Sequence, residues 1–156
     1  MLTRLIAIRH AKPFSEGFAD EILRPISKQG RSIQISITEK LKSLGFVPDQ
    51  IFSSPILRAE QTAHVISEIF DDTPVTVNEA LGYNFNQSDL LSLIPSPSEN
   101  KTIFFVGHAP TLADFVNKLV GSEALPEGLK QSGAAVVDFR LDVEYGAATF
   151  SGYYHP

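Results

Sequence analysis

The stretch from Lys101 to Gly121, KTIFFVGHAPTLADFVNKLVG, contains a complete strand, loop and helix. Residues Thr102 to Val106 form the most apolar short run of the chain, which predicts a buried strand. Pro110 is tolerated at the start of a helix, and Gly121 suits the position after the last turn. Between them, the expected helix has one apolar face, formed by Leu112, Phe115, Val116 and Leu119. The stretch therefore predicts a buried strand followed by a helix that packs against the sheet.

The same alternation of strand and helix patterns runs through the part of the chain before this stretch. Apolar runs and helix-start signals predict the elements in the following order: a strand at 2–8, a loop at 11–26, a helix from Ser27 to Gly45, a strand at 50–53, a helix that starts at Ser54-Pro55, a strand at 75–77 and a short helix at 88–94. Strands that alternate with helices favour a mainly parallel sheet covered on both faces.

The C-terminal part has a different pattern. Residues 134–141 and 147–154 flank a turn around Tyr145-Gly146, which predicts a β-hairpin. The expected fold class is therefore α/β, a three-layer αβα sandwich with a mainly parallel sheet and an antiparallel C-terminal edge hairpin. A length of 156 residues suits one domain over residues 1–156.

Composition excludes several classes of function. The formal net charge is −5 and no run of lysine and arginine is present, so nucleic acid and anionic membranes are not expected as partners. The chain has no cysteine, which excludes disulfides, thiolate catalysis and cysteine-ligated metals. It also lacks an apolar run long enough to cross a bilayer and the pattern of a signal peptide. We expect a soluble protein of the cytoplasm.

Basic side chains and histidines follow the predicted strands. Arg9 and His10 come at the end of the first strand, Arg58 lies one helical turn after the second, and His108 follows Gly107 at the end of the fourth. Ligands of open α/β sheets bind at the carboxyl ends of parallel strands. The sequence therefore predicts that these four side chains meet at one edge of the sheet.

These residue types suit a phosphate ligand. Arginine presents a planar, permanently charged fork of donors that matches phosphate oxygens. Histidine can be neutral and nucleophilic, or charged and donating, near neutral pH. The helices expected to begin at Pro55 and Pro110 would direct free N–H groups toward the same edge. No nucleotide-binding loop of the Walker or dinucleotide type is present.

Each residue taken alone also has an ordinary structural explanation. A single histidine at a strand end is commonly structural, and Arg58 alone would be a solvated helix residue. His64 lies beside the apolar stripe of its helix and is expected to be structural, whereas His155 is expected to be exposed. The spacing of the histidines does not match a zinc motif, so no metal site is expected. Only the convergence of four suitable groups favours a functional site.

Three segments resemble the motifs of the histidine phosphatase superfamily, which is also called phosphoglycerate-mutase-like. The first is Arg9-His10-Ala11-Lys12, the second is SSPILRAEQTA from Ser53 to Ala63, and the third is VGHAP from Val106 to Pro110. The order of the motifs and the size of the chain are most similar to the small SixA-type phosphohistidine phosphatases. One departure is Ala11, where most of the superfamily has glycine.

The resemblance implies a mechanism and a set of site residues. It implies that His10 is the nucleophile and forms a phosphohistidine that water hydrolyses, while Arg9, Arg58 and His108 bind the phosphoryl oxygens. It implies neither a metal nor an organic cofactor. Many members use a carboxylate after the third strand as proton donor, and Glu79 is the only acid in that region, 78–87. A solvated loop charge is the alternative for Glu79, and further acid candidates lie in the first loop: Glu16, Asp20 and Glu21.

Several functions remain open on this basis. The leading expectation is a metal-independent phosphatase that removes phosphate from phosphohistidine on a protein, since the chain has no room for a large lid over the pocket. A phosphatase for a small phosphomonoester such as a sugar phosphate is the enzyme alternative, and a mutase is less favoured because it must retain the phosphoryl group. A non-catalytic phosphate-binding module is the alternative of a different class. The oligomeric state and the partner protein are open.

Overall fold

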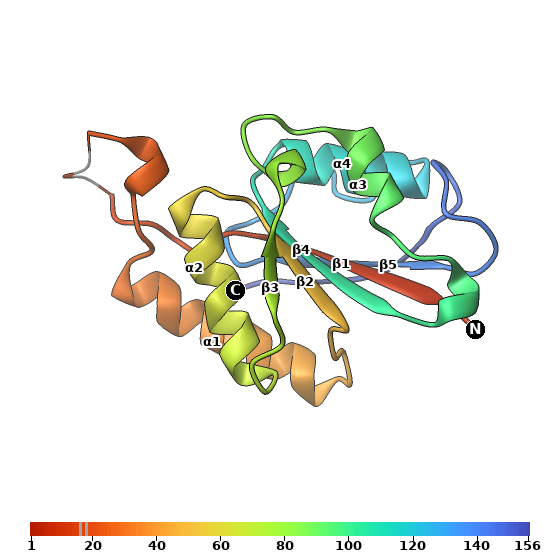
Figure 1. The fold of residues 1–156 in the computed structure, drawn as a ribbon, viewed down its shortest axis with the longest axis horizontal. Coiled ribbons are helices and arrows are strands. Elements are labelled where there is room, and N and C mark those ends of the chain that lie inside the picture. Colours follow the sequence, from red (N-terminus) through yellow and green to blue (C-terminus); the bar gives the residue numbers. More distant parts are fainter. Residues whose placement is uncertain (16, 18) are drawn as a thin grey trace.

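The computed structural model of the chain describes residues 1–15, 17 and 19–156. Within these residues, six strands form one sheet in the order β3-β2-β4-β1-β5-β6 (Figure 1). Their bounds are Thr3–Arg9 for β1, Gln50–Ser53 for β2, Val75–Val77 for β3, Thr102–Gly107 for β4, Ala134–Phe139 for β5 and Thr149–Tyr154 for β6. The first four strands pair in parallel, whereas β5 is antiparallel to both of its neighbours, β1 and β6. This arrangement confirms the expected fold class.

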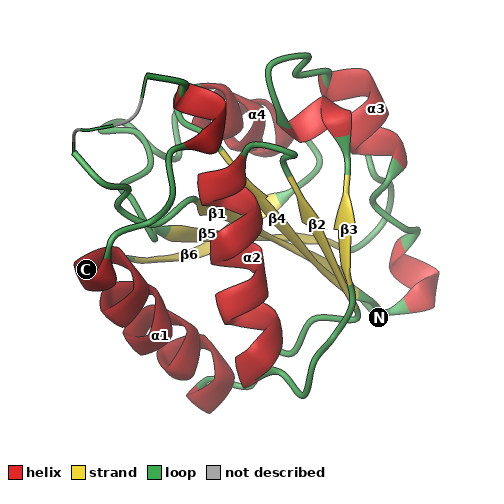
Figure 2. Cartoon of the chain, turned by 60° about the vertical axis from the view of Figure 1, so that its left-hand side comes forward, coloured by secondary structure: helices red, strands yellow, loops and turns green. Residues whose placement is uncertain are grey.

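The helices form the two outer layers. Helices α1 (Lys28–Ser43) and α2 (Leu57–Ile69) cover one face of the sheet, and α3 (Gln87–Ser92) and α4 (Thr111–Val120) cover the other (Figures 1 and 2). Three short 3₁₀ helices complete the described structure: η1 (Glu21–Leu23), η2 (Glu79–Leu81) and η3 (Pro97–Glu99). No helix in the described part of the chain is both long and apolar enough to span a bilayer.

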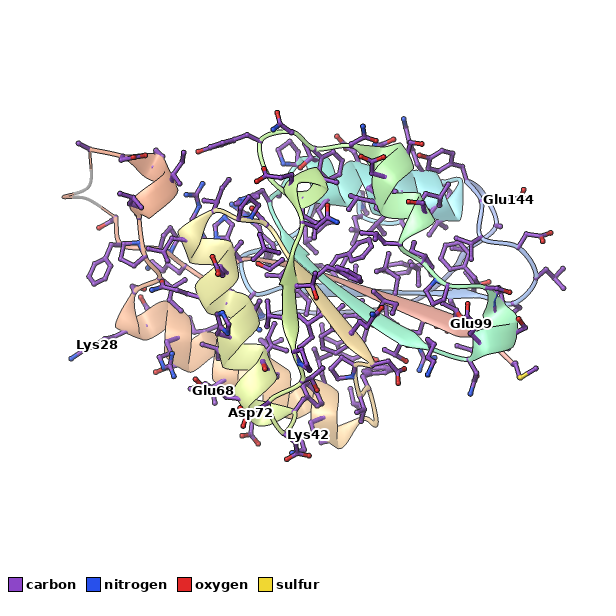
Figure 3. All side chains as sticks on the ribbon, viewed as in Figure 1. Lys28, Lys42, Glu68, Asp72, Glu99 and Glu144 are labelled. Carbon is purple, nitrogen blue, oxygen red and sulfur yellow. The ribbon has the colours of Figure 1, made fainter. Side chains whose placement is uncertain are left out.

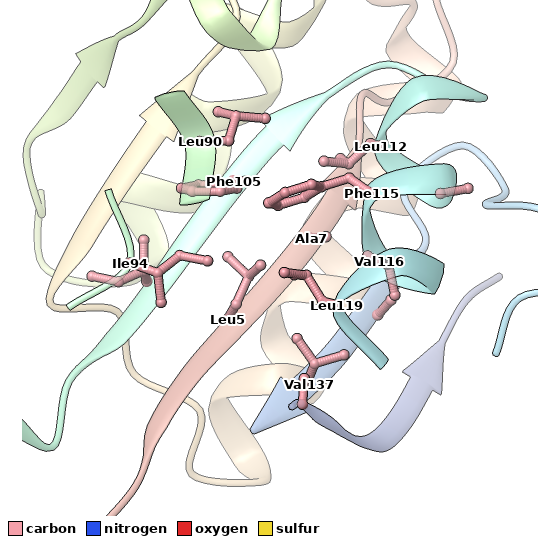
Figure 4. Close-up of a cluster of buried hydrophobic side chains, with 14 of the residues drawn as sticks. Leu5, Ala7, Leu90, Ile94, Phe105, Leu112, Phe115, Val116, Leu119 and Val137 are labelled. Carbon is pink, nitrogen blue, oxygen red and sulfur yellow. The ribbon is translucent and has the colours of Figure 1, made fainter. Parts of the chain in front are cut away.

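The alternating side chains of β1 explain why the sheet is covered on both faces. Leu5 and Ala7 belong to the hydrophobic cluster under α3 and α4, while Ile6 and Ile8 belong to the cluster under α1 and α2, and all four are fully buried. Figure 4 shows the first of these clusters, in which Phe115 of α4 lies over the sheet. The central residues of a strand that is buried on both faces must be apolar, as the run from Leu5 to Ile8 is.

Two helices begin later than the sequence suggested. The residue before α2 is Ile56 and not Ser54, because the hydroxyl oxygen of Ser54 accepts a hydrogen bond from the Ile56 backbone N–H (3.1 Å) before the helix begins. Helix α4 begins at Thr111, directly after Pro110. Sequence signals place a helix start correctly only to within a turn, since several residues in a row can serve as the cap.

The C-terminal hairpin has shorter strands and a longer connection than expected. Strand β5 ends at Phe139 and β6 begins at Thr149. The connection instead bonds to the end of α4, since the backbone N–H of Gly146 donates to the carbonyl of Lys118 (3.0 Å) and that of Ala148 donates to the carbonyl of Leu119 (2.9 Å). Backbone groups used in this way are not available to extend the strand ladder.

Charged side chains on the outer layers point away from the sheet. Figure 3 shows this for Lys28 and Lys42 of α1 and for Glu68 of α2, which lie on the outside of that helical layer. Arg9 at the end of β1 and Arg58 in the first turn of α2 instead line a pocket, together with His10 and His108.

Candidate active site

The two histidines expected at the site come together because their strands are neighbours. Strand β1 pairs in parallel with β4, so that Arg9 lies opposite Gly107, and the backbone N–H of His10 donates to the Gly107 carbonyl (2.9 Å). The next residue of each strand is then a histidine. The ring centres of His10 and His108 are 5.2 Å apart, with their planes tilted by 54°.

Both arginines of the sequence hypothesis line the same pocket as these histidines. The pocket has a volume of about 450 Å³ at the carboxyl ends of the parallel strands. Its lining combines Arg9, His10, Arg58 and His108 with residues that the sequence had not pointed to: Pro13, Arg24, Gly82, Tyr83, Phe85, Ala109, Thr111 and Gln131. A pocket of this size accommodates a phosphoryl group together with part of the molecule that carries it.

His10 is held as a neutral ring whose Nε2 forms no hydrogen bond with the described residues. Its side chain is 6% exposed, and Nδ1 lies 2.8 Å from the carbonyl oxygen of Ala11. A carbonyl can only accept, so Nδ1 carries the proton and Nε2 keeps its lone pair. Burial lowers the pKa of His10 to about 3, and the nearby positive charges of Arg58 and Arg9 act in the same direction. At neutral pH the ring can therefore attack phosphorus without first losing a proton.

The loop after His10 is tied to two helices. The backbone N–H of Ala11 donates to Thr62 Oγ1 (2.9 Å), and this hydroxyl donates to the carbonyl of Arg58 (2.7 Å). A Cβ on Gly30 of α1 would lie 2.2 Å from the carbonyl oxygen of Lys12, so only glycine allows this approach. Thr62 was not singled out from the sequence, although its place four residues after Arg58 puts it on the same face of the helix.

His108 has a buried partner in Ser54. Its Nε2 lies 2.8 Å from the Ser54 hydroxyl, and either atom can be the donor. Burial lowers the pKa of His108 to about 4, and the charges of Arg58 and Arg9 lower it further. The sequence placed Ser54 directly after the second strand, at a helix start and within the second motif, but nothing in the sequence pairs it with a histidine 54 positions away.

The arginines of the pocket are held through backbone carbonyls. Arg9 Nη1 donates to the carbonyl of Leu129 (3.0 Å), and Arg58 Nη1 donates to that of Glu21 (2.7 Å). Among the described residues, the Nε atoms of both arginines are buried without a partner. Burial lowers the pKa of Arg9, and the charge of Arg58 adds to this effect. A site with this excess of positive charge favours a ligand with two negative charges.

Within the described residues, the candidate proton donors do not gather in the pocket as the arginines and histidines do. Glu79 is exposed in η2 and does not line the pocket. Asp20 caps η1 by accepting from the Ile22 N–H (3.0 Å), whereas the carboxylate of Glu21 lies 2.9 Å from Arg24 Nη2 and 3.9 Å from Arg58 Nη1. Glu16 lies outside the described residues. The identity of the proton donor therefore stays a prediction.

The remaining histidines lie elsewhere. His64 is exposed on α2, and His155 is exposed near the C-terminal residue of the chain. Within the described part of the chain, no three side chains of histidine, cysteine, aspartate or glutamate are grouped so that they could hold a metal ion.

Comparisons with known proteins agree with this architecture. No protein-family model matches the sequence, and no curated protein matches it. Among solved structures, SixA from Agrobacterium tumefaciens superposes with a TM-score of 0.80 at 25% identity, over 99% of both chains. A protein histidine phosphatase SixA complexed with tungstate gives 0.80 at 22% identity, over 98% of this chain and 97% of that one. A mycobacterial glucosyl-3-phosphoglycerate phosphatase gives 0.75 at 14% identity over both complete chains. The resemblance predicted from the three motifs is thus confirmed, with a fold shared from end to end.

Proposed function

We propose that this chain, which has the fold of the histidine phosphatase superfamily, is a metal-independent phosphatase that uses His10 as its nucleophile. The observation that carries the proposal is the neutral, buried ring of His10, whose Nδ1 is bound to the Ala11 carbonyl and whose Nε2 is free. This is the protonation state that attack on phosphorus requires.

In the first step, the lone pair of His10 Nε2 forms a bond to phosphorus while the bond from phosphorus to the leaving group breaks. Arg9, Arg58 and His108 bind the phosphoryl oxygens, and their positive charge and N–H donors stabilise the charge of the transition state. The leaving group takes up a proton as it departs. In the second step, water attacks the phosphorus of phosphohistidine, inorganic phosphate is released and His10 returns to its neutral form.

We propose phosphohistidine on another protein as the substrate. Exposed apolar side chains support this proposal: Tyr83 lines the pocket and is 65% exposed, and Ile22 and Leu23 of η1 are 44% and 59% exposed. Helix η1 is held at the pocket through Glu21, which contacts Arg24 and Arg58. Exposed apolar residues around a polar pocket suit contact with a protein surface. A phosphoramidate nitrogen is also readily protonated, so its departure depends less on a carboxylic acid than that of an alcohol.

A small phosphomonoester is the second candidate substrate. The pocket volume of about 450 Å³ is sufficient for a sugar phosphate. One structural neighbour is described as a glucosyl-3-phosphoglycerate phosphatase, and its fold matches this chain over its full length.

The test compares phosphate release from a phosphohistidine protein and from a panel of phosphomonoesters, with EDTA present throughout. We expect release that survives EDTA and falls by at least about 1,000-fold in His10→Ala. His64→Ala, which removes an exposed histidine outside the pocket, is the matched control and should retain wild-type activity. Tungstate, a tetrahedral oxyanion, is expected to inhibit competitively, since one structural neighbour was solved with it.

Each outcome has a distinct meaning. Preference for the phosphohistidine protein supports the proposed substrate, and saturation by one phosphomonoester supports the second candidate. Release that persists in His10→Ala contradicts the assignment of the nucleophile. Tight binding of phosphate without release from any substrate favours a non-catalytic binding module.

A further inference from the structure

A second cavity, of about 430 Å³, adjoins the phosphate pocket. It shares two lining residues with that pocket, Arg9 and Gln131. The rest of its lining comes from the loop after His10, from α1, from the loop before β5 and from the C-terminal residue: Lys12, Ile33, Lys130, Ser132 and Pro156. We call this feature the basic cavity. The phosphatase mechanism proposed above does not use it.

The basic cavity concentrates positive charge that has no internal partner. Arg9, Lys12 and Lys130 line it, and within the described residues none of the three forms an ion pair. Lys12 Nζ donates to Gln29 Oε1 (3.0 Å), a neutral acceptor that leaves the charge uncompensated. The whole chain has a formal charge of −5, so this local excess runs against the average. Such a concave, positively charged wall attracts anions.

Ser132 is a lining residue of the basic cavity whose side chain is enclosed by the protein. Ser132 is 1% exposed, and its Oγ has no hydrogen-bond partner among the described residues. Its φ of +61° is uncommon for a residue with a side chain.

The backbone fixes the basic cavity relative to the nucleophile. The N–H of Ser132 donates to the carbonyls of Arg9 (3.1 Å) and His10 (3.3 Å), and the N–H of Arg9 donates to the carbonyl of Gly133 (3.1 Å). On the other side, the N–H of Lys130 donates to the hydroxyl of Tyr153 (2.8 Å). A group bound in the basic cavity is therefore held at a set position beside a phosphoryl group on His10.

We propose that the basic cavity is a subsite for a carboxylate that belongs to the same polypeptide as the phosphohistidine. This inference rests on the proposed phosphatase function and adds a preference for acidic residues beside the phosphorylated histidine. Lys12 and Lys130 attract the carboxylate, and Arg9 lies between it and the phosphoryl group.

The test measures binding, so that it does not depend on turnover. One peptide carries a hydrolysis-resistant phosphonate analogue of phosphohistidine flanked by glutamates, and the other has glutamines in their place. Calorimetry with the wild type should show about five- to tenfold tighter binding of the acidic peptide, as expected for two partly exposed charge pairs. In Lys12→Gln/Lys130→Gln the two affinities should agree within about twofold, while the affinity for the neutral peptide is unchanged.

A matched control has the same change in net charge at a distant place. Lys118 also donates from Nζ to a glutamine Oε1, that of Gln87 (3.0 Å), and Lys101 lines another cavity of the surface. Lys101→Gln/Lys118→Gln should therefore keep the preference for the acidic peptide.

Three results would overturn the inference: equal affinities in the wild type, a preference that survives in Lys12→Gln/Lys130→Gln, or no binding of either peptide. Inorganic phosphate titrated alone separates a site for free anions from a substrate subsite. If Lys12→Gln/Lys130→Gln binds one phosphate ion fewer per chain than the wild type, and the wild type shows no peptide preference, the basic cavity binds free phosphate and not substrate. Failure of the phosphatase proposal is detected separately, by the absence of turnover of a phosphohistidine peptide with neutral flanks.

Discussion

Two arginines on strand β1 differ sharply in their surroundings. Arg4 forms a bidentate ion pair with Asp138 of β5, with Nε 2.7 Å from Oδ1 and Nη2 3.0 Å from Oδ2. The hydroxyl of Ser151 donates to the same carboxylate (2.6 Å). The side chain of Arg9, five residues later, has only the carbonyl of Leu129 as a hydrogen-bond acceptor within the described part of the chain.

The surroundings favour the charged groups at the Arg4 end of the strand and disfavour the charge of Arg9 at the other end. Burial on its own would raise the pKa of Asp138, but the hydrogen bonds from Arg4 and Ser151 outweigh it and hold the pKa below its ordinary value. At Arg9, burial and the neighbouring charge of Arg58 both lower the pKa of the guanidinium. The folded state thus gains stability from the charge of Arg4 and loses stability through that of Arg9. The same residue type is paired with a carboxylate at one end of the strand and has no ion pair among the described residues at the other, depending on whether a neighbouring strand supplies a carboxylate.

The largest effect is expected from a change of Arg9, at the carboxyl end of β1. In Arg9→Gln, kcat/KM for phosphate release should fall by about 100- to 1,000-fold, because a charged donor to the phosphoryl group is removed. The free energy of unfolding should stay equal or rise, since the repulsion by Arg58 is relieved. Steady-state kinetics and denaturant unfolding measure the two quantities. A clear loss of stability would mean that Arg9 supports the fold as Arg4 does.

A change of Arg4, which forms the ion pair with Asp138, should have the opposite effect: stability falls and activity is retained. In Arg4→Gln, the buried carboxylate of Asp138 loses its ion pair, and the free energy of unfolding should fall by about 2–3 kcal/mol. The kcat should be unchanged, because Arg4 does not line the pocket. Denaturant unfolding at neutral pH gives the first value. If kcat fell together with stability, the two ends of β1 would not be independent.

A third effect concerns the histidines of the pocket. An ordinary histidine has a pKa of 6.5, but His10 and His108 have values of about 3 and about 4 in the folded state. Between pH 6.5 and 5 the unfolded chain therefore binds protons that the folded chain does not, so stability must fall as the pH falls. The expected slope is about 1.4 kcal/mol per pH unit for each of these histidines.

Unfolding by denaturant at pH 7, 6 and 5 measures this slope. In His10→Asn the slope should be smaller by the contribution of one histidine. A slope that is the same in His10→Asn and in the wild type would show that His10 is not buried as a neutral ring.

The sequence anticipated the layers of the fold because apolar patterning is a local property. Continuous apolar runs such as Thr102 to Val106 belong to strands buried on both faces, and the structure places them at the centre of the sheet. The order of motifs at strand ends also anticipated that Arg9, His10, Arg58 and His108 would lie at one edge, and all four line one pocket. These predictions needed only the rule that parallel strands present their carboxyl ends together.

Other features depend on contacts between distant residues. The Ser54–His108 hydrogen bond, the link from Ala11 through Thr62 to Arg58 and the basic cavity each join segments that no local pattern connects. The same holds for the pairing of Arg4 with Asp138, 134 positions away. The sequence by itself determined the layers, the strand ends and the residue types that gather there, because these follow from periodicity and chain order. Only the tertiary structure decided which charges are neutralised and which remain free for a ligand, because this depends on side chains that the sheet brings together from β1, β4, β5 and their loops.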